Sequence, residues 1–349
     1  MTATMPSAPT AGADGTGGPD LDLEALALHL VHGTQQAALA AVAHVGGGDG
    51  EAADAAAVDA MRRAFGLLPG TGTVVIGEGE KDDAPMLFNG ERVGTGGGAA
   101  FDLAVDPLEN TRACAGDGDG AIAVVAAAPA GTLWGSAAAW YMDKLVVGPA
   151  AAGAVDITRP LSGNLAAVGH ALDRPVGSLR AVVLDKPRHQ PLVAGLREAG
   201  VGVRLIPDGD VAGALEVLLP DGTADLLVGV GGAPEGVITA CSVRLLGGDM
   251  QGALAPQSSG ELERVAAAGH GLDAPLLLDD LVAADQCCVV ATGVTTGRLL
   301  RAPTRGRGGW QTWTMVSTPR HPCLIIEATH DIEPAPLRGP NRSEPCPTR

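Results

Sequence analysis

Acidic residues that stand beside glycine at the ends of apolar runs are the side chains best suited to chemistry in this sequence. Five such clusters occur, at residues 48–54, 77–80, 106–111, 207–210 and 231–236. Ligands of α/β proteins bind at strand ends, and carboxylates that converge there repel one another unless a cation lies between them. Hard oxygen ligands select Mg²⁺ or Mn²⁺. The pattern therefore predicts a site for divalent cations.

The run from Asp106 to Thr111 is the most informative of the five clusters. An apolar strand at residues 101–105 delivers Asp106 to its edge, and Glu109 follows three residues later, so that both carboxylates can face one point. We expect Asp106 to bridge two metal ions, with the Leu108 carbonyl and Glu109 as further ligands, while Thr111 orients a metal-bound water. Such a pair of ions clamps a phosphate ester. The alternative from this segment alone is an acidic turn that caps a helix.

Two further segments suit an anionic ligand. Residues 231–236 lie between a predicted strand and a predicted helix, so their N–H groups can hold an anion at the helix N-terminus; the alternative is an ordinary turn. Lys186 and Arg188 follow another strand and suit a second phosphate, or else are surface charge at a helix end. Tyr141, the single tyrosine, is either a core residue or a ligand contact, and the sequence favours the core.

Composition excludes several classes of function. The 349 residues carry a net charge of −17, which argues against binding to nucleic acid. The longest apolar stretch, at residues 121–130, is shorter than the roughly 20 residues that span a bilayer, and we expect a soluble, cytoplasmic protein. The six cysteines show no spacing suited to zinc. The glycines at 94–98 precede a strand instead of following one, which excludes a dinucleotide site, and Ala128 excludes an EF-hand beginning at Asp117.

The spacing of apolar residues predicts an α/β layered protein. The predicted helices are at residues 21–45, 53–65, 190–199, 211–218 and 234–246, and the strands at 73–76, 101–105, 121–127, 144–147, 180–184, 201–206, 224–228, 287–291 and within 311–327. Strands that alternate with helices predict a largely parallel sheet in the second half. We expect an N-terminal α+β half at 21–175 with the metal site, a C-terminal α/β half at 176–332 with the substrate contacts, and disordered tails at 1–20 and 333–349.

In this order the segments resemble one family, the class II (GlpX-type) fructose-1,6-bisphosphatases, within the lithium-sensitive, metal-dependent sugar phosphatase superfamily. The resemblance extends over residues 25–330. The matching runs are Val75-Ile76-Gly77-Glu78-Gly79-Glu80, Ala84-Pro85-Met86-Leu87, Asp106-Pro107-Leu108-Glu109, Tyr141-Met142-Asp143-Lys144-Leu145, Lys186-Pro187-Arg188-His189, Ile206-Pro207-Asp208-Gly209-Asp210, Gly231-Gly232-Ala233-Pro234-Glu235-Gly236 and Ala291-Thr292-Gly293-Val294-Thr295.

The resemblance implies an αβαβα sandwich of the fructose-1,6-bisphosphatase/inositol monophosphatase type. It implies hydrolysis of fructose 1,6-bisphosphate to fructose 6-phosphate and phosphate with Mg²⁺ or Mn²⁺, in a homo-oligomer (a dimer or tetramer). Carried over by position, the metal ligands are Asp54, Glu78, Asp106, Leu108, Glu109 and Glu235. The catalytic residues are Asp54, Thr111 and Glu78, with Asp54 and Thr111 activating water. The substrate contacts are Tyr141, Lys186, Arg188, Asp208, Asp210 and Gly232.

Three positions depart from the pattern that the resemblance implies. The family's glycine-rich loop reads Gly-Asp-Lys-Asn-Thr-Ala-Asp, whereas this chain has Gly50 at the lysine and Ala52 at the threonine, and Asn110 stands where glycine is usual. A cation beside the reacting phosphoryl group is worth about 2.7–4 kcal/mol of transition-state stabilisation. We hypothesise that Lys81, on the neighbouring loop, supplies a cation in its place. The alternatives are a paralogue that dephosphorylates another ketose or nucleoside phosphate, and a non-catalytic sugar-phosphate-binding protein.

Overall fold

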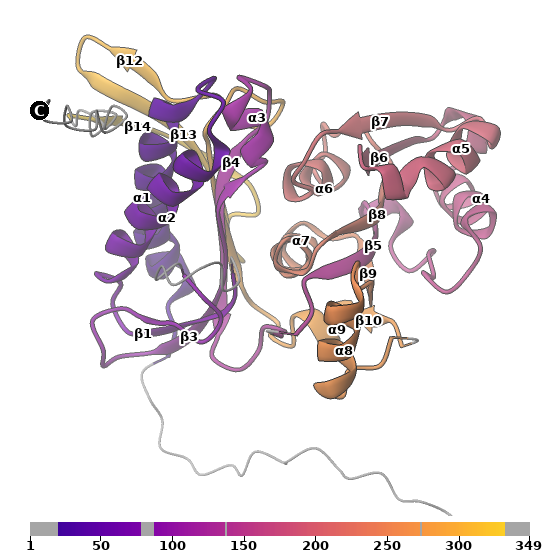
Figure 1. Cartoon of the computed structure of the whole chain (residues 1–349), viewed down its shortest axis with the longest axis horizontal. Helices are drawn as coiled ribbons and strands as arrows, with labels where there is room; N and C mark the ends of the chain where they lie inside the picture. The colour runs from indigo at the N-terminus through magenta and orange to yellow at the C-terminus, as the bar shows by residue number, and fades with distance from the viewer. Residues whose placement is uncertain (1–19, 78–86, 137, 273, 332–349) are drawn as a thin grey trace, which may run out of the picture.

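The computed structural model describes residues 20–77, 87–136, 138–272 and 274–331 (Figure 1). Its helices are α1 (Leu23–Ala41), α2 (Gly50–Phe65), α3 (Thr111–Ala115), α4 (Leu161–Ala171), α5 (Gln190–Glu198), α6 (Val211–Leu218), α7 (Ala233–Leu246), α8 (Ser259–Ala267) and α9 (Leu278–Leu281). Its strands are β1 (Thr71–Ile76), β2 (Arg92–Val93), β3 (Ala100–Glu109), β4 (Ile122–Pro129), β5 (Tyr141–Val147), β6 (Arg180–Leu184), β7 (Gly202–Ile206), β8 (Leu226–Gly232), β9 (Asp249–Leu254), β10 (Leu276–Leu277), β11 (Cys288–Gly293), β12 (Thr304–Gly306), β13 (Gly309–Ser317) and β14 (Leu324–His330).

The strands form two mixed sheets. The first has the order β12-β13-β11-β4-β3-β1-β2, with β14 paired to β13, and the second has the order β10-β9-β5-β8-β6-β7. In the second sheet β6 is parallel to β7 and β8, as the alternation of strands and helices predicted, whereas β5 is antiparallel to β8 and β9. The chain enters the second sheet at β5 and returns to the first at β11, so no single point along the chain separates the sheets.

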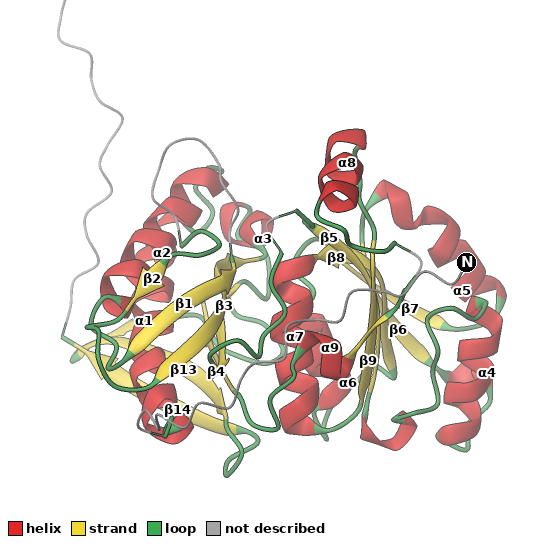
Figure 2. Ribbon diagram, turned by 90° about the horizontal axis from the view of Figure 1, so that it is seen from below, coloured by secondary structure: helices red, strands yellow, loops and turns green. Residues whose placement is uncertain are grey.

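Helices and sheets stack in five layers. Helices α1 and α2 cover the outer face of the first sheet, α6 and α7 lie between the sheets, and α4 and α5 cover the outer face of the second (Figures 1 and 2). Helix α7 contacts β3, β4 and β11 on one side and β5, β8 and β9 on the other. The predicted αβαβα sandwich is therefore confirmed. In the part of the chain that the structure describes, no helix combines the length and apolar character needed to cross a bilayer.

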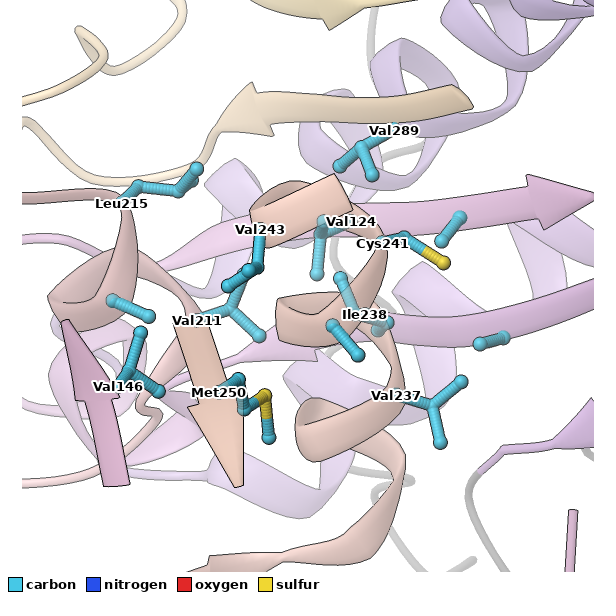
Figure 3. Packing of buried hydrophobic residues seen from close by; sticks show 14 of the residues in the cluster. Val124, Val146, Val211, Leu215, Val237, Ile238, Cys241, Val243, Met250 and Val289 are labelled. Atoms are coloured by element: carbon cyan, nitrogen blue, oxygen red, sulfur yellow. The ribbon is translucent and has the colours of Figure 1, made fainter. Parts of the chain in front are cut away.

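The central layer is held by small aliphatic side chains. Figure 3 shows Val124 and Val289 of the first sheet and Val146 and Met250 of the second packing against Val211, Leu215, Val237, Ile238, Cys241 and Val243 of α6 and α7. Each fully buried side chain of this size contributes about 1.5–3 kcal/mol. Two similar clusters lie under the outer helices. The core fixes α6 and α7, whose N-termini carry part of the candidate site.

Several predicted boundaries shift where a polar residue continues or begins an element. Helix α2 begins at Gly50, earlier than predicted, because the Asp49 side chain accepts from the Ala52 N–H (3.0 Å) and caps it. Strand β3 continues to Glu109, and its register against β4 shifts between Asp106 and Glu109 because Pro107 has no N–H to donate. The predictions for residues 1–19, 78–86 and 332–349 lie outside the described residues.

Candidate active site

Glu109 has the least exposed side chain of the predicted carboxylate ligands that the structure describes. Its Oε1 accepts a hydrogen bond from the Val211 N–H (2.6 Å) at the start of α6, whereas its buried Oε2 has no hydrogen-bond partner among the described residues. Glu109 thus caps a helix, as the alternative interpretation of this segment had it, but the helix is α6, 102 residues away along the chain. The second oxygen stays available to a ligand.

Glycines make room for three carboxylates. A Cβ added at Gly209 would overlap Glu109, one at Gly231 would overlap the Asp210 carboxylate, and one at Gly232 would overlap the Glu235 carboxylate. Gly209 also has a φ of 62°, in the left-handed region that glycine adopts at little cost. At these glycines of the predicted acidic clusters, the backbone therefore lies close to acidic side chains.

The three carboxylates influence one another electrostatically. Burial, followed by repulsion from Asp210 and Glu235, raises the pKa of Glu109 well above its ordinary value, and the Val211 N–H and Lys144 oppose this shift only in part. The pKa of Glu235 is also raised by burial, with Lys144 opposing and Asp210 adding to the effect. Burial and mutual repulsion thus disfavour the charged forms of Glu109 and Glu235 in the absence of a bound cation.

Asp106 and Leu108 lie at the bulge of β3, just before Glu109. Asp106 is buried, and its Oδ1 accepts from the Leu108 N–H (3.1 Å). The Leu108 carbonyl accepts from the Thr111 hydroxyl (2.9 Å), which leaves the lone pairs of Thr111 Oγ1 free to face a water. The bulge thus places a carboxylate, a carbonyl and a hydroxyl on one short segment.

Asn110 takes a left-handed conformation at the position where the family has glycine. Its φ and ψ of 65° and 50° are left-handed, a conformation that asparagine tolerates better than most residues, and its side chain caps α3 by accepting from the Ala113 N–H (3.3 Å). Gly50 packs on the same segment, because an added Cβ would lie 3.0 Å from Thr111 Cγ2. Asp54 is one helical turn after Gly50 and so shares its face of α2.

Lys186 and Arg188, which we call the anion clamp, lie beside the second sheet. Lys186 pairs with Asp208 (2.8 Å), and Arg188 donates twice to the Val230 carbonyl (2.8 and 3.2 Å). The Arg188 guanidinium also lies over the Tyr141 ring, 5.3 Å from its centroid, and Tyr141 pairs with Gly232 across β5 and β8. Arg188 is exposed and Lys186 is half-buried, and these contacts hold both side chains in place. Tyr141 is half-buried beside it, a position that suits a ligand contact.

Sequence reasoning missed two residues that organise the site. His189 is buried; its Nδ1 donates to the Leu184 carbonyl (2.8 Å) and its Nε2 accepts from the Val230 N–H (2.8 Å). Lys144 is fully buried and donates to both oxygens of Asp210 at 2.7 Å. The available signal for Lys144 was a lone lysine inside an apolar strand, because such a residue must pair when it is buried.

A cavity of about 390 Å³ opens between the two sheets next to Asn110 and Asp208. Its far wall carries Arg204 and Arg298, both paired with Glu216. Only its near rim belongs to the predicted site.

The carboxylates fit divalent cations in chemistry, although the described residues do not complete a metal site alone. In the described ranges no three His, Cys, Asp or Glu side chains are grouped so that they could hold a metal ion. Glu78, a predicted ligand, lies outside those ranges. A hard cation would satisfy the unpartnered Oε2 of Glu109 and offset the repulsion from Asp210 and Glu235.

The five-layer fold, with carboxylates at the end of one strand and a lysine–arginine clamp at the end of another, fits the class of layered α/β phosphatases. The family model described as bacterial fructose-1,6-bisphosphatase, glpX-encoded, matches residues 24–330, and the chain belongs to this family. It is 43% identical over 293 residues to fructose-1,6-bisphosphatase 1 class 2 of Escherichia coli (strain K12), covering 80% of this chain and 87% of that protein. The class 2 enzyme of Shigella flexneri matches to the same extent.

Proposed function

We propose that this chain hydrolyses fructose 1,6-bisphosphate to fructose 6-phosphate and phosphate, with Mg²⁺ or Mn²⁺ bound. The names of its relatives support the substrate. The single observation that carries the proposal is the buried Oε2 of Glu109, which has no hydrogen-bond partner among the described residues and lies near Asp210 and Glu235.

The residues that would hold the ions are Asp54, Glu78, Asp106, the Leu108 carbonyl, Glu109 and Glu235. Bound there, the ions would polarise the phosphoryl group and lower the pKa of an attacking water. The Thr111 hydroxyl donates its hydrogen bond to the Leu108 carbonyl, so its Oγ1 would accept from the water and orient it, and Asp54 would take the proton that the water loses.

The clamp binds the substrate through charge and shape. Arg188 is held by the Val230 carbonyl and the Tyr141 ring, so its guanidinium loses little freedom when it binds a phosphate. Lys186 exchanges Asp208 for the phosphate, and Asp208 and Asp210 then accept from the sugar hydroxyls. Gly232 lets the substrate approach the backbone.

Phosphate release from a panel of sugar mono- and bisphosphates, with Mn²⁺ or Mg²⁺, tests the proposal. Asp106→Asn should abolish turnover. The matched control is Asp102→Asn on the same strand, because Asp102 is also buried but accepts from the Thr132 and Leu133 N–H groups, away from the site. If no substrate turns over above the Asp106→Asn background while fructose 1,6-bisphosphate still raises the melting temperature, the chain is a binding protein.

The substrate is tested further at Gly50, where the family has lysine. Gly50→Lys should raise turnover of fructose 1,6-bisphosphate if the missing cation alone limits the reaction. Gly50→Ala is the control, because the added Cβ meets Thr111 Cγ2 in both variants and only the lysine adds charge. Equal turnover in the two variants would favour another ketose or nucleoside phosphate as the substrate.

A further inference from the structure

Lys144 stands apart from the other basic residues of the chain. The sequence holds three lysines against twenty arginines, and two of the three pair with the two aspartates of the Asp208-Gly209-Asp210 loop. Of the two paired lysines Lys144 is the buried one, with 0% of its side chain exposed. A chain that uses arginine elsewhere has here a compact ammonium, which fits where a planar guanidinium would not.

Lys144 is closely surrounded, and its ammonium is paired with Asp210. It donates to both Asp210 oxygens at 2.7 Å, while a Cβ added at Gly231 would lie 3.0 Å from Lys144 Nζ and one at Gly236 3.6 Å from its Cε. Lys144 is thus enclosed by two glycines. Each Asp210 oxygen has a second lone pair, so the held carboxylate can still accept from a substrate hydroxyl.

Lys144 also acts on the neighbouring carboxylates. Its ammonium lies inside the acidic cluster: it pairs with both oxygens of Asp210, and Gly231, whose added Cβ would meet both Asp210 and Lys144, lies beside Gly232 and Glu235. Since both Asp210 oxygens already accept from an ammonium, Asp210 is a poor ligand for a second cation. Removing the ammonium would turn Asp210 into a further free carboxylate beside the glutamates.

We propose that Lys144 is a positioning residue: it holds Asp210 toward the substrate and keeps that carboxylate out of the metal-ligand set. The inference rests on the proposed function for the role of Asp210. It makes a prediction that a merely structural lysine does not, because loss of Lys144 should weaken substrate binding while it strengthens cation binding.

The probe is Mn²⁺ alone, titrated into the metal-free full chain. Binding is measured by calorimetry or by the electron paramagnetic resonance signal of free Mn²⁺. Lys144→Met should tighten Mn²⁺ binding by about tenfold and Asp210→Asn should weaken it by about tenfold, because a unit charge is removed within the cluster. The double variant should return to within about threefold of the native affinity. Arg159→Met, which removes a charge from the exposed Arg159–Asp156 pair, should leave the affinity unchanged. With fructose 1,6-bisphosphate, Lys144→Met should raise KM by more than it lowers kcat.

Lys144→Met that binds Mn²⁺ as the native chain does, or more weakly, overturns the proposal. If this variant is not recovered folded, Asp210→Asn and the double variant decide, because they differ only in the lysine charge; equal affinities overturn the proposal. A native chain that binds no Mn²⁺ contradicts the proposed function. In that event a crystal structure of Lys144→Met, or of Lys144→Gln if that variant alone folds, decides: Asp210 should leave its place against Gly231, and an unmoved Asp210 overturns the positioning role.

Discussion

Two lysine–aspartate pairs of nearly equal length meet at one loop and differ in burial. Lys144 and Asp210 lie 2.7 Å apart with 0% and 3% of their side chains exposed, whereas Lys186 and Asp208 lie 2.8 Å apart with 18% and 34% exposed. Water screens the second pair, so breaking it costs little. The first pair is buried, so loss of either partner leaves the other charge buried without a counter-charge. Contact distance alone would have given both pairs the same role.

The largest expected effect separates the two pairs by stability. Lys144→Met should lower the free energy of unfolding by about 3–5 kcal/mol, because it leaves the Asp210 carboxylate buried without its counter-charge. Lys186→Met should lower it by about 1 kcal/mol or less. Urea denaturation of the metal-free protein at one pH measures both. Equal losses would show that burial does not distinguish the pairs.

The next effect concerns how the exposed pair and Arg188 are held. His189→Leu leaves the Val230 N–H without its partner, which costs about 1–3 kcal/mol, whereas the Leu184 carbonyl still accepts from the Lys186 N–H. Because Val230 also carries the carbonyl that binds Arg188, KM should rise by about tenfold, the equivalent of one charge-assisted hydrogen bond. The control is His170→Leu at the exposed end of α4. An unchanged KM in His189→Leu would mean that the clamp does not depend on this anchor.

An exchange of lysine for arginine tests the space around each ammonium. Lys144→Arg keeps the charge but must fit a guanidinium against Gly231 and Gly236, and overpacking of this kind costs about 1–3 kcal/mol. Lys186→Arg has solvent beside it and should change the stability by about 0.5 kcal/mol or less. Thermal denaturation of the two variants makes the comparison. If Lys144→Arg is as stable as the native protein, the site is roomier than the glycines indicate.

Local sequence predicted much of this region, and the missing parts are those that depend on distant partners. The predicted strand at 180–184 and the predicted helix at 211–218 coincide with β6 and α6, because each is largely apolar and has a polar residue at its start. The role of Lys144 could not be predicted, since Asp210 lies 66 residues away. The return of β11 to pair with β4 is likewise a non-local contact that no local pattern encodes.

Helices α4 and α8 were not predicted, for a different reason. Helix α4 contains Gly163 and Gly169, which weaken the helical signal, and α8 presents mostly exposed polar residues around the buried Val265. Among the candidate site residues, the sequence predicted that Lys186 and Arg188 follow a strand, and they follow β6. The sequence did not indicate that Glu109 would cap α6 with one oxygen.

The smallest effect extends the comparison to Asp143, the neighbour of Lys144 on β5. Burial raises the pKa of Asp143 above its ordinary value of 3.8, and the hydrogen bond from the Lys144 backbone N–H and the attraction of the Lys144 ammonium oppose this only in part. The folded state therefore binds more protons than the unfolded state above pH 3.8, so ionisation of Asp143 reduces stability as the pH rises through that window. Relative to Asp143→Asn, the native protein should lose on the order of 1 kcal/mol or less across it.

Asp156 provides a control of opposite sign. The Thr158 hydroxyl and N–H lower the pKa of Asp156, so its contribution to stability is present above pH 3.8 and is lost as the pH falls. Relative to Asp156→Asn, the native protein should therefore gain stability as the pH rises. Urea midpoints measured upward from pH 3.5 in the absence of metal give both differences. Slopes of the same sign would mean that burial does not determine the pKa shift of Asp143. The contrast between buried and exposed aspartates would then not hold for this pair.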